Sequence, residues 1–195
     1  MKTGPALLVV TLAVSFARSA RGDDAAIDAL VSEASSLEQT GDLAGANKKL
    51  EQAFALSQRA DVAGKLGLLQ QRSGAYSESA QHLELAMRFF PEGRPPAERQ
   101  KLIEAFTDVR AKVAAVRFRV KPDAEHVTID GTSPSLTSLD YDVFVMPGTR
   151  RISVPGRADV TIEAVANQSY PIDVASVPKV VVAPKATIEA SKRPR

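Results

Sequence analysis

The chain has 195 residues, 44% hydrophobic and 25% charged, so one or two domains with apolar cores are expected. Its formal charge of +2 falls to about −1 without the first 22 residues, which hold three basic side chains and no acidic ones. A chain so balanced lacks the basic face typical of nucleic-acid binding, and 5% aromatic residues offer few stacking surfaces for bases. Cysteine is absent, which excludes disulfides, thiolate metal sites and a cysteine nucleophile.

Residues 1–22 have the three-part layout of a secretory signal peptide. Lys2 precedes an apolar run from Ala6 to Phe16, and small and basic residues follow. This run of 11 residues is shorter than the roughly 20 that span a bilayer. Cleavage after Ala17 or after Gly22 would satisfy the small-residue rule. We expect a periplasmic or extracellular mature chain without a membrane span; the alternative is an inner-membrane protein anchored by an uncleaved signal.

A period of 33 residues runs through the next part of the chain. Gly41 and Gly74 begin two matching segments, and a small, a large and a small residue follow each glycine at offsets of 5, 9 and 12. These residues are Ala46, Leu50 and Ala53 in the first copy and Ser79, Leu83 and Ala86 in the second. The spacing predicts a helix face that packs closely on another helix, because small residues admit a neighbouring backbone.

Both copies resemble the tetratricopeptide repeat, a helix-turn-helix unit of about 34 residues. The second copy matches at Leu66, Gly67, Gly74, Tyr76, Leu83, Ala86 and Pro91. The first copy, from about Ile27 to Arg59, is degenerate: Glu33 stands where a large apolar residue is usual, and the closing proline is missing. The resemblance implies helical hairpins whose first helices line a concave surface. A plain antiparallel helical bundle is the alternative interpretation.

A capping helix is expected after the repeats, since two stacked repeats bury little apolar surface alone. Pro95 and Pro96 fit a helix start. The segment from Ala97 to Val116 then has one apolar stripe at spacings of 3 and 4, formed by Leu102, Ile103, Phe106, Val109, Val113 and Val116. We predict that this helix covers the end of the repeat stack and leads into the next domain.

The apolar period changes from 3.6 to 2 at Val116, which predicts a half-buried strand and a domain boundary. About six short apolar segments follow, separated by the turn pairs Asp130-Gly131, Pro147-Gly148 and Pro155-Gly156. Such a pattern favours a small antiparallel β-sandwich.

The order of residues in this part resembles the PEGA domain, a small β-module of bacterial envelope proteins that often follows tetratricopeptide repeats. Its V-x-V-D-G strand and turn correspond to Val127, Ile129, Asp130 and Gly131, and its V-x-P-G turn to Val145, Met146, Pro147 and Gly148. Asp123-Ala124 replaces the usual Gly-Ala pair, and His126 replaces an apolar or small residue. The resemblance implies a non-catalytic module.

The expected fold class is therefore α+β, with four segments. They are a signal peptide over 1–22, tetratricopeptide-like helical-hairpin repeats with a capping helix over 23–115, a PEGA-like antiparallel β-sandwich over 116–176, and a tail over 177–195. The tail has five basic residues against one acidic residue and contains three prolines, which predicts an extended, mobile segment. It is either a solvated end or a contact for anionic envelope polymer or lipid headgroups.

Residue patterns for catalysis or metal binding are missing from the sequence. Neither His82 nor His126 has metal-ligand spacing, and both are interpreted as structural or exposed. Asp140 and Asp142 would share one face of a strand, where solvated carboxylates are favoured over a cation site or an acid/base pair. No nucleophile elbow, phosphate loop or dinucleotide fingerprint occurs. We predict no catalytic residue, no metal and no cofactor.

These observations predict an exported, non-catalytic scaffold that binds a protein or peptide partner in the concave surface of its repeats. By repeat register, the groove positions fall at Asp28, Val31, Ser35 and Glu38 in the first unit and at Asp61, Leu68, Gln71 and Arg72 in the second. The alternative is a module that binds peptidoglycan or surface polysaccharide through the β-domain and the basic tail. An enzyme would need a polar cleft that the sequence does not indicate.

Overall fold

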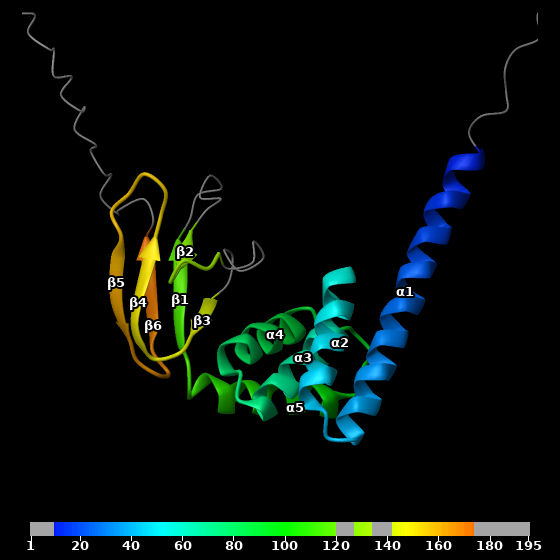
Figure 1. Ribbon diagram of the computed structural model, residues 1–195, viewed down its shortest axis with the longest axis horizontal. Helices are drawn as coiled ribbons and strands as arrows, with labels where there is room; N and C mark the ends of the chain where they lie inside the picture. Colours follow the sequence, from blue (N-terminus) through cyan, green and yellow to red (C-terminus); the bar gives the residue numbers. More distant parts are fainter. Residues whose placement is uncertain (1–9, 120–126, 134–141, 174–195) are drawn as a thin grey trace, which may run out of the picture.

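The computed structural model of the chain describes residues 10–119, 127–133 and 142–173. Over these ranges the fold is α+β, with helices in the amino-terminal part and two small three-stranded sheets after them (Figure 1). The predicted tail over 177–195 lies outside the described residues, as do His126 and Asp140. Both candidate cleavage positions, after Ala17 and after Gly22, lie within the first helix. Among the described helices, none is both long and apolar enough to cross a membrane.

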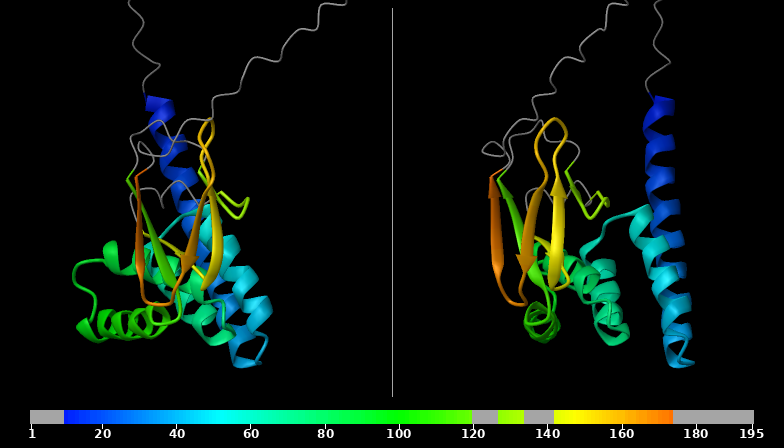
Figure 2. Two further views of the ribbon diagram at one scale, coloured as in Figure 1. Left: turned by 90° about the vertical axis from the view of Figure 1, so that its left-hand side faces the viewer. Right: turned by 60° about the vertical axis from the view of Figure 1, so that its left-hand side comes forward.

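The helical part consists of two hairpins and a fifth helix. The bounds are α1 (Val10–Gln39), α2 (Leu43–Leu56), α3 (Ala60–Ser73), α4 (Tyr76–Arg88) and α5 (Pro96–Arg110). Helix α2 packs along the carboxy-terminal part of α1, whose amino-terminal part extends beyond the other helices (Figures 1 and 2).

The two hairpin turns are built alike, at the glycines that mark the sequence repeat. Gly41 and Gly74 have φ angles of +85° and +82°, which a residue without a Cβ adopts at little cost. Behind each glycine a backbone N–H returns to the helix: Asp42 N donates to Leu37 O at 2.9 Å, and Ala75 N donates to Gln70 O at 2.9 Å. These bonds satisfy helix-terminal carbonyls in the manner of a Schellman motif.

The repeated small and large residues are the buried ones. Each of the six positions that follow the glycines at offsets 5, 9 and 12 is buried, namely Ala46, Leu50, Ala53, Ser79, Leu83 and Ala86. Helices α3 and α4 approach each other closely, since a Cβ added to Gly67 would stand 2.7 Å from Leu83 Cγ. Ser79 Oγ donates to the Gly67 carbonyl at 2.7 Å, so the buried hydroxyl is satisfied.

Helix α5 is shorter than predicted. It begins at Pro96, as the proline signal indicates, but ends at Arg110 instead of reaching Val116. Of the predicted stripe, Leu102 and Val109 are buried within the helix, whereas Ile103 is 39% exposed. Val113 and Val116 are buried beyond the helix end, because they belong to the turn and the first strand. Their spacing continued the helical period by coincidence.

The β-part has six strands within the described residues. They are β1 (Ala114–Arg119), β2 (Thr128–Ile129), β3 (Asp142–Val145), β4 (Gly148–Ser153), β5 (Val160–Ala164) and β6 (Ser169–Asp173). One sheet has the order β3-β1-β6 and the other β2-β4-β5. The expectation of a wholly antiparallel arrangement is wrong for one pair, since β1 and β6 are parallel. Turn residues in a sequence predict hairpins between neighbouring strands, whereas β1 and β6 are far apart in the chain, so no turn signal indicates their pairing.

The turn after β2 has the predicted residues in the conformation that they favour. Asp130 and Gly131 have φ angles of +52° and +81°, as a tight two-residue hairpin turn requires. The Asp130 carboxylate accepts from Arg151 N at 2.9 Å and from an Arg150 guanidinium nitrogen at 3.0 Å. These bonds lower the pKa of Asp130 below its ordinary value.

The helices and the sheets are packed together. Both sheets contribute to one apolar cluster, which includes Val116, Ile152 and Ile172. A second cluster, which we call the junction cluster, joins α3, α4 and α5 to the sheet through Ala115 of β1 and Phe144 of β3. Phe144 meets Phe106 of α5 edge to face, with ring centroids 5.7 Å apart. Figure 2 shows the sheets standing beside α4 and α5, away from α1.

Candidate functional site

A groove of about 430 Å³ lies where α1, α3 and α5 approach one another. It brings together five of the eight residues predicted from repeat register. We call this space the central groove. It is lined by Ser35, Glu38, Lys65, Leu68, Gln71, Arg72 and Lys101. The first helices of the two hairpins therefore face a shared concave space, and α5 closes its other side.

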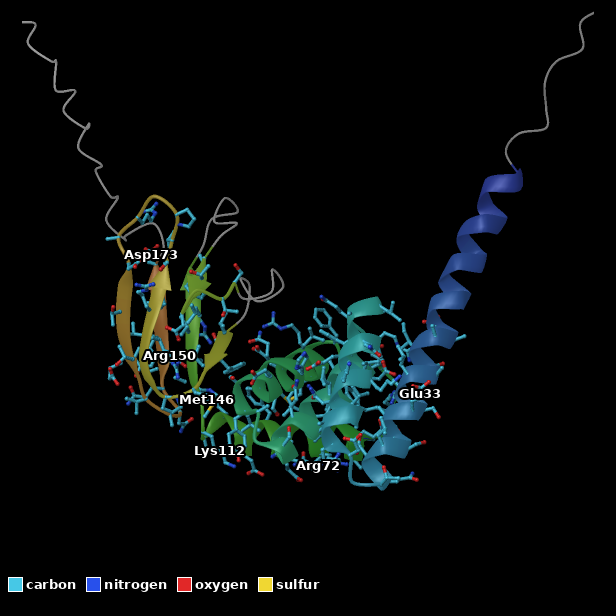
Figure 3. The ribbon with its side chains drawn as sticks, in the orientation of Figure 1. Glu33, Arg72, Lys112, Met146, Arg150 and Asp173 are labelled. Atoms are coloured by element: carbon cyan, nitrogen blue, oxygen red, sulfur yellow. The ribbon has the colours of Figure 1, made fainter. Side chains whose placement is uncertain are left out.

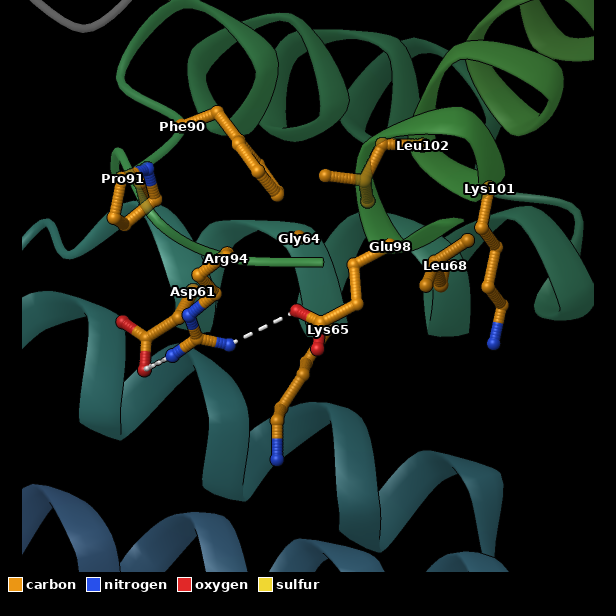
Figure 4. A pocket seen from close by; sticks show the side chains of 11 residues that line it. Asp61, Gly64, Lys65, Leu68, Phe90, Pro91, Arg94, Glu98, Lys101 and Leu102 are labelled. Carbon is orange, nitrogen blue, oxygen red and sulfur yellow. Dashed lines mark hydrogen bonds and ion pairs between the residues drawn. The ribbon is translucent and has the colours of Figure 1, made fainter. Parts of the chain in front are cut away.

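A second hollow of about 170 Å³ adjoins the central groove between α3, α5 and the segment that connects α4 to α5 (Figure 4). We call it the apolar hollow. Its lining is Ala60, Asp61, Gly64, Lys65, Leu68, Phe90, Pro91, Arg94, Glu98, Lys101 and Leu102. Phe90 and Leu102 point toward each other across it (Figure 4). Of the predicted residues it contains Asp61, and it shares Leu68 with the central groove.

Helix α3 supplies the wall common to both spaces. Asp61, Lys65, Leu68 and Arg72 follow one another at spacings of 4, 3 and 4, which places them on one face of the helix. The opposite face of α3 is buried, with Leu66 and Leu69 in the core between α1, α2 and α3. The local sequence thus separates a core face from a groove face, and the helical period fixes which side chains meet the open space.

Two predicted residues lie apart from both spaces. Asp28 on α1 forms an ion pair with Arg59, with 3.4 Å between the carboxylate oxygen and the guanidinium nitrogen. Val31 is half-buried and packs in the apolar clusters at Leu50 and Ile27. The structure therefore assigns both side chains to contacts within the helical part.

Most charges that line the two spaces are paired. Glu38 on α1 forms an ion pair with Arg72 on α3, across the central groove. Asp61 accepts two hydrogen bonds from Arg59, at 3.0 and 2.8 Å, and these lower the pKa of the Asp61 carboxyl. Arg94 bridges Asp61, at 3.8 Å, and Glu98, at 3.1 Å (Figure 4). These pairs join α1 to α3 and α3 to the start of α5.

Two lysines of the lining were missed by the sequence reasoning. Lys65 and Lys101 are exposed and line both spaces, and within the described residues neither has an ion-pair partner. Lys65 could have been found from the helical spacing on α3, between Asp61 and Leu68. Lys101 could not, because it lies on the predicted capping helix, to which the repeat register assigned no groove residue.

Other residues considered for chemistry have structural contacts. His82 Nδ1 lies 2.8 Å from Gln70 Oε1, and its ring meets Phe54 edge to face at 5.0 Å. Asp142 accepts from Arg117 at 2.6 and 2.9 Å, which joins β3 to β1. In the part of the chain that the structure describes, no three metal-ligating side chains gather in one place.

A third hollow, of about 280 Å³, lies at the junction of α4 with the sheets. Met146 and Arg150, labelled in Figure 3, line it together with Ser77 and Asp130. Arg150 is held there by its ion pair with Asp130 and by the Met146 carbonyl, which accepts from Nε at 2.9 Å. Arg150 and Asp130 in this hollow are therefore engaged in fixing the turn after β2.

Comparison with protein-family models, with curated proteins and with solved structures gave no significant match.

Proposed function

We propose that the chain is an exported, non-catalytic scaffold that holds a protein or peptide partner in the central groove of tetratricopeptide-like repeats. The β-part is then a PEGA-like sandwich attached to that scaffold. The equivalent glycine turns and the equivalent buried residues of the two hairpins support the repeat interpretation. The apolar cluster that both sheets share supports the sandwich.

One observation carries the binding proposal: five residues that repeat register alone places together line the same groove. A groove between helices of this kind suits an extended or helical segment of a partner, because its lining offers charged groups beside the apolar Leu68. The groove lies in the helical part, which would let the β-part remain unchanged on binding.

The ion pair between Glu38 and Arg72 permits a test that separates folding from binding. Glu38→Arg or Arg72→Glu alone places like charges together and should weaken both the fold and the binding. The double variant Glu38→Arg/Arg72→Glu restores an attractive pair with reversed polarity. We expect it to unfold thermally like the wild type, yet to recover less partner from a periplasmic extract, as measured by quantitative mass spectrometry.

Lys48→Glu provides the matched control, because Lys48 is exposed on α2 and lines neither space. It should leave partner recovery unchanged. If the charge-swapped protein folds normally and still recovers the wild-type set of proteins, the partner does not bind in the central groove and the proposal fails.

The alternative, binding of envelope polymer by the β-part and the tail, draws less support. The tail lies outside the described residues. On the sheets, Arg117, Arg150 and Arg151 are each paired with an aspartate. Sedimentation with purified cell-wall sacculi distinguishes the two functions, since the proposed scaffold should stay in the supernatant.

A further inference from the structure

The apolar hollow adjoins the central groove and has a different chemistry. Leu68, Leu102, Phe90 and Gly64 contribute apolar atoms to its wall (Figure 4). Its volume of about 170 Å³ far exceeds the roughly 15 Å³ that holds one water. The space therefore admits a side chain, and burying an apolar one there would contribute binding free energy.

The two lysines at the border of the hollow set the charge of what enters. Lys65 and Lys101 line the hollow and the central groove alike, and their side chains extend from the hollow in a similar direction (Figure 4). The neighbouring carboxylates of Asp61 and Glu98 are paired with guanidinium groups, Asp61 with Arg59 and Arg94 and Glu98 with Arg94. Both lysines are without an ion-pair partner among the described residues, so the border presents an uncompensated positive charge.

We propose that the apolar hollow takes one large apolar side chain of the partner, while Lys65 and Lys101 bind a carboxylate of a residue next to it. This inference rests on the proposed function and names the class of partner: a peptide segment in which Asp or Glu lies beside Leu, Ile, Met or Phe. The chain's own segment over 177–195 contains one such pair, Ile188-Glu189, but the lysines would repel its five basic residues, so the proposed occupant is a separate partner.

The experiment selects peptides from a phage-displayed random dodecamer library on the immobilised full chain. The inference predicts an enriched motif with an acidic residue within two positions of a large apolar one. Binding of a fluorescent peptide with that motif should weaken about tenfold in Lys65→Glu/Lys101→Glu, and it should weaken with added salt. Lys65→Arg/Lys101→Arg should retain the binding, and Lys48→Glu serves as the control for charge reversal elsewhere.

The apolar subsite is tested separately with Ala60→Leu, which adds bulk at the half-buried edge of the hollow. Selection on this variant should lose the preference for a large apolar residue and keep the acidic one. Circular dichroism and thermal unfolding establish that each variant is folded. Gly64 is left unchanged, because a Cβ there would already stand 3.3 Å from Leu102.

The outcomes separate this inference from the proposed function. A motif that lacks the acidic residue or the apolar residue, with binding that still depends on Glu38 and Arg72, overturns the inference and leaves the function intact. If the wild-type chain enriches no peptide relative to the Glu38→Arg/Arg72→Glu protein, both the inference and the proposed function are overturned.

Discussion

Gly67 and Gly64 on α3 differ in how closely the neighbouring helices approach them. A Cβ on Gly67 would lie 2.7 Å from Leu83 Cγ and 3.1 Å from its backbone nitrogen. We expect Gly67→Ala to lower the free energy of unfolding by about 1–2 kcal/mol, because overpacking outweighs the roughly 1 kcal/mol gain in helix propensity. Urea denaturation followed by circular dichroism measures the change.

Gly64→Ala is the matched comparison within the same helix. Its Cβ would stand 3.3 Å from Leu102 Cδ2 and 3.5 Å from Ala86 Cβ, and these side-chain atoms can shift slightly. We expect a change within about 1 kcal/mol of zero, since the propensity gain offsets the tight contact. Equal losses for both variants would show that α3 and α4 are not in close contact at Gly67.

His82 makes the packing of α2, α3 and α4 sensitive to acid. Burial lowers its pKa below the ordinary 6.5, and a hydrogen bond from the ring to the Glu78 backbone carbonyl, together with the charges of Glu51 and Glu78, offsets part of this effect. The folded state thus favours the neutral ring, so the stability from this residue is present above about pH 6.5 and is lost as the pH falls toward the folded-state pKa. The excess stability of wild type over His82→Gln should therefore shrink between pH 7.5 and pH 5.5 in urea denaturation.

Glu84 on the same helix contributes a pH dependence of stability with the opposite sign. The effect of His82 is therefore measured as the difference between wild type and His82→Gln, in which the contribution of Glu84 cancels. Burial raises its pKa above the ordinary 4.5, so its stabilising contribution is present at low pH and is lost as the pH rises through the folded-state value. Repeating the His82→Gln comparison in a Glu84→Gln background should give the same pH trend. A constant difference across the pH range would contradict the role given to His82.

At the scale of elements, the sequence predicts what is repeated or local. The 33-residue period identified both hairpins, because Gly41 and Gly74 occupy the same left-handed turn position. The Asp130-Gly131 pair likewise predicted a turn with positive φ. The end of α5 and the parallel pairing of β1 with β6 escaped prediction. Both depend on the junction between helices and sheets, which joins residues far apart in the chain.

Arg110 holds the end of α5 against this junction. Its guanidinium donates to the carbonyls of Val113, at 2.8 Å, and Gln168, at 3.1 Å, and to Ser169 Oγ at 3.0 Å. We expect Arg110→Ala to lower the free energy of unfolding by about 1–3 kcal/mol, because carbonyls lose charged donors. Arg99→Ala, on the exposed surface of the same helix, should change it by less than about 0.5 kcal/mol in the same denaturant titration.

At the scale of the whole molecule, the candidate site was predictable in part. Repeat register found Ser35, Glu38, Leu68, Gln71 and Arg72, because equivalent positions of repeated helices face the same way. Asp28 and Val31 line neither space, because α1 makes its own contacts there, with Arg59 and with the core. Lys101 required knowing that α5 completes the groove, which is a property of the assembled helices and not of either repeat.

The junction cluster predicts that the helical part and the sheets unfold as one unit. Phe144 of β3 is 5% exposed, lies edge to face with Phe106, and has the Arg110 guanidinium 5.9 Å from its ring centroid. In hydrogen exchange followed by mass spectrometry, the slowest amides of α4 and β1 should report the same opening free energy. Phe144→Ala should lower the free energy of unfolding by about 3–5 kcal/mol through lost packing, and the opening free energies of α4 and β1 should then differ. Val165→Ala, at a 47% exposed position, should leave these two free energies equal. If α4 and β1 already differ in the wild type, the sheets are an independent domain, and substitutions at Phe144 would lower the stability of the β-part alone.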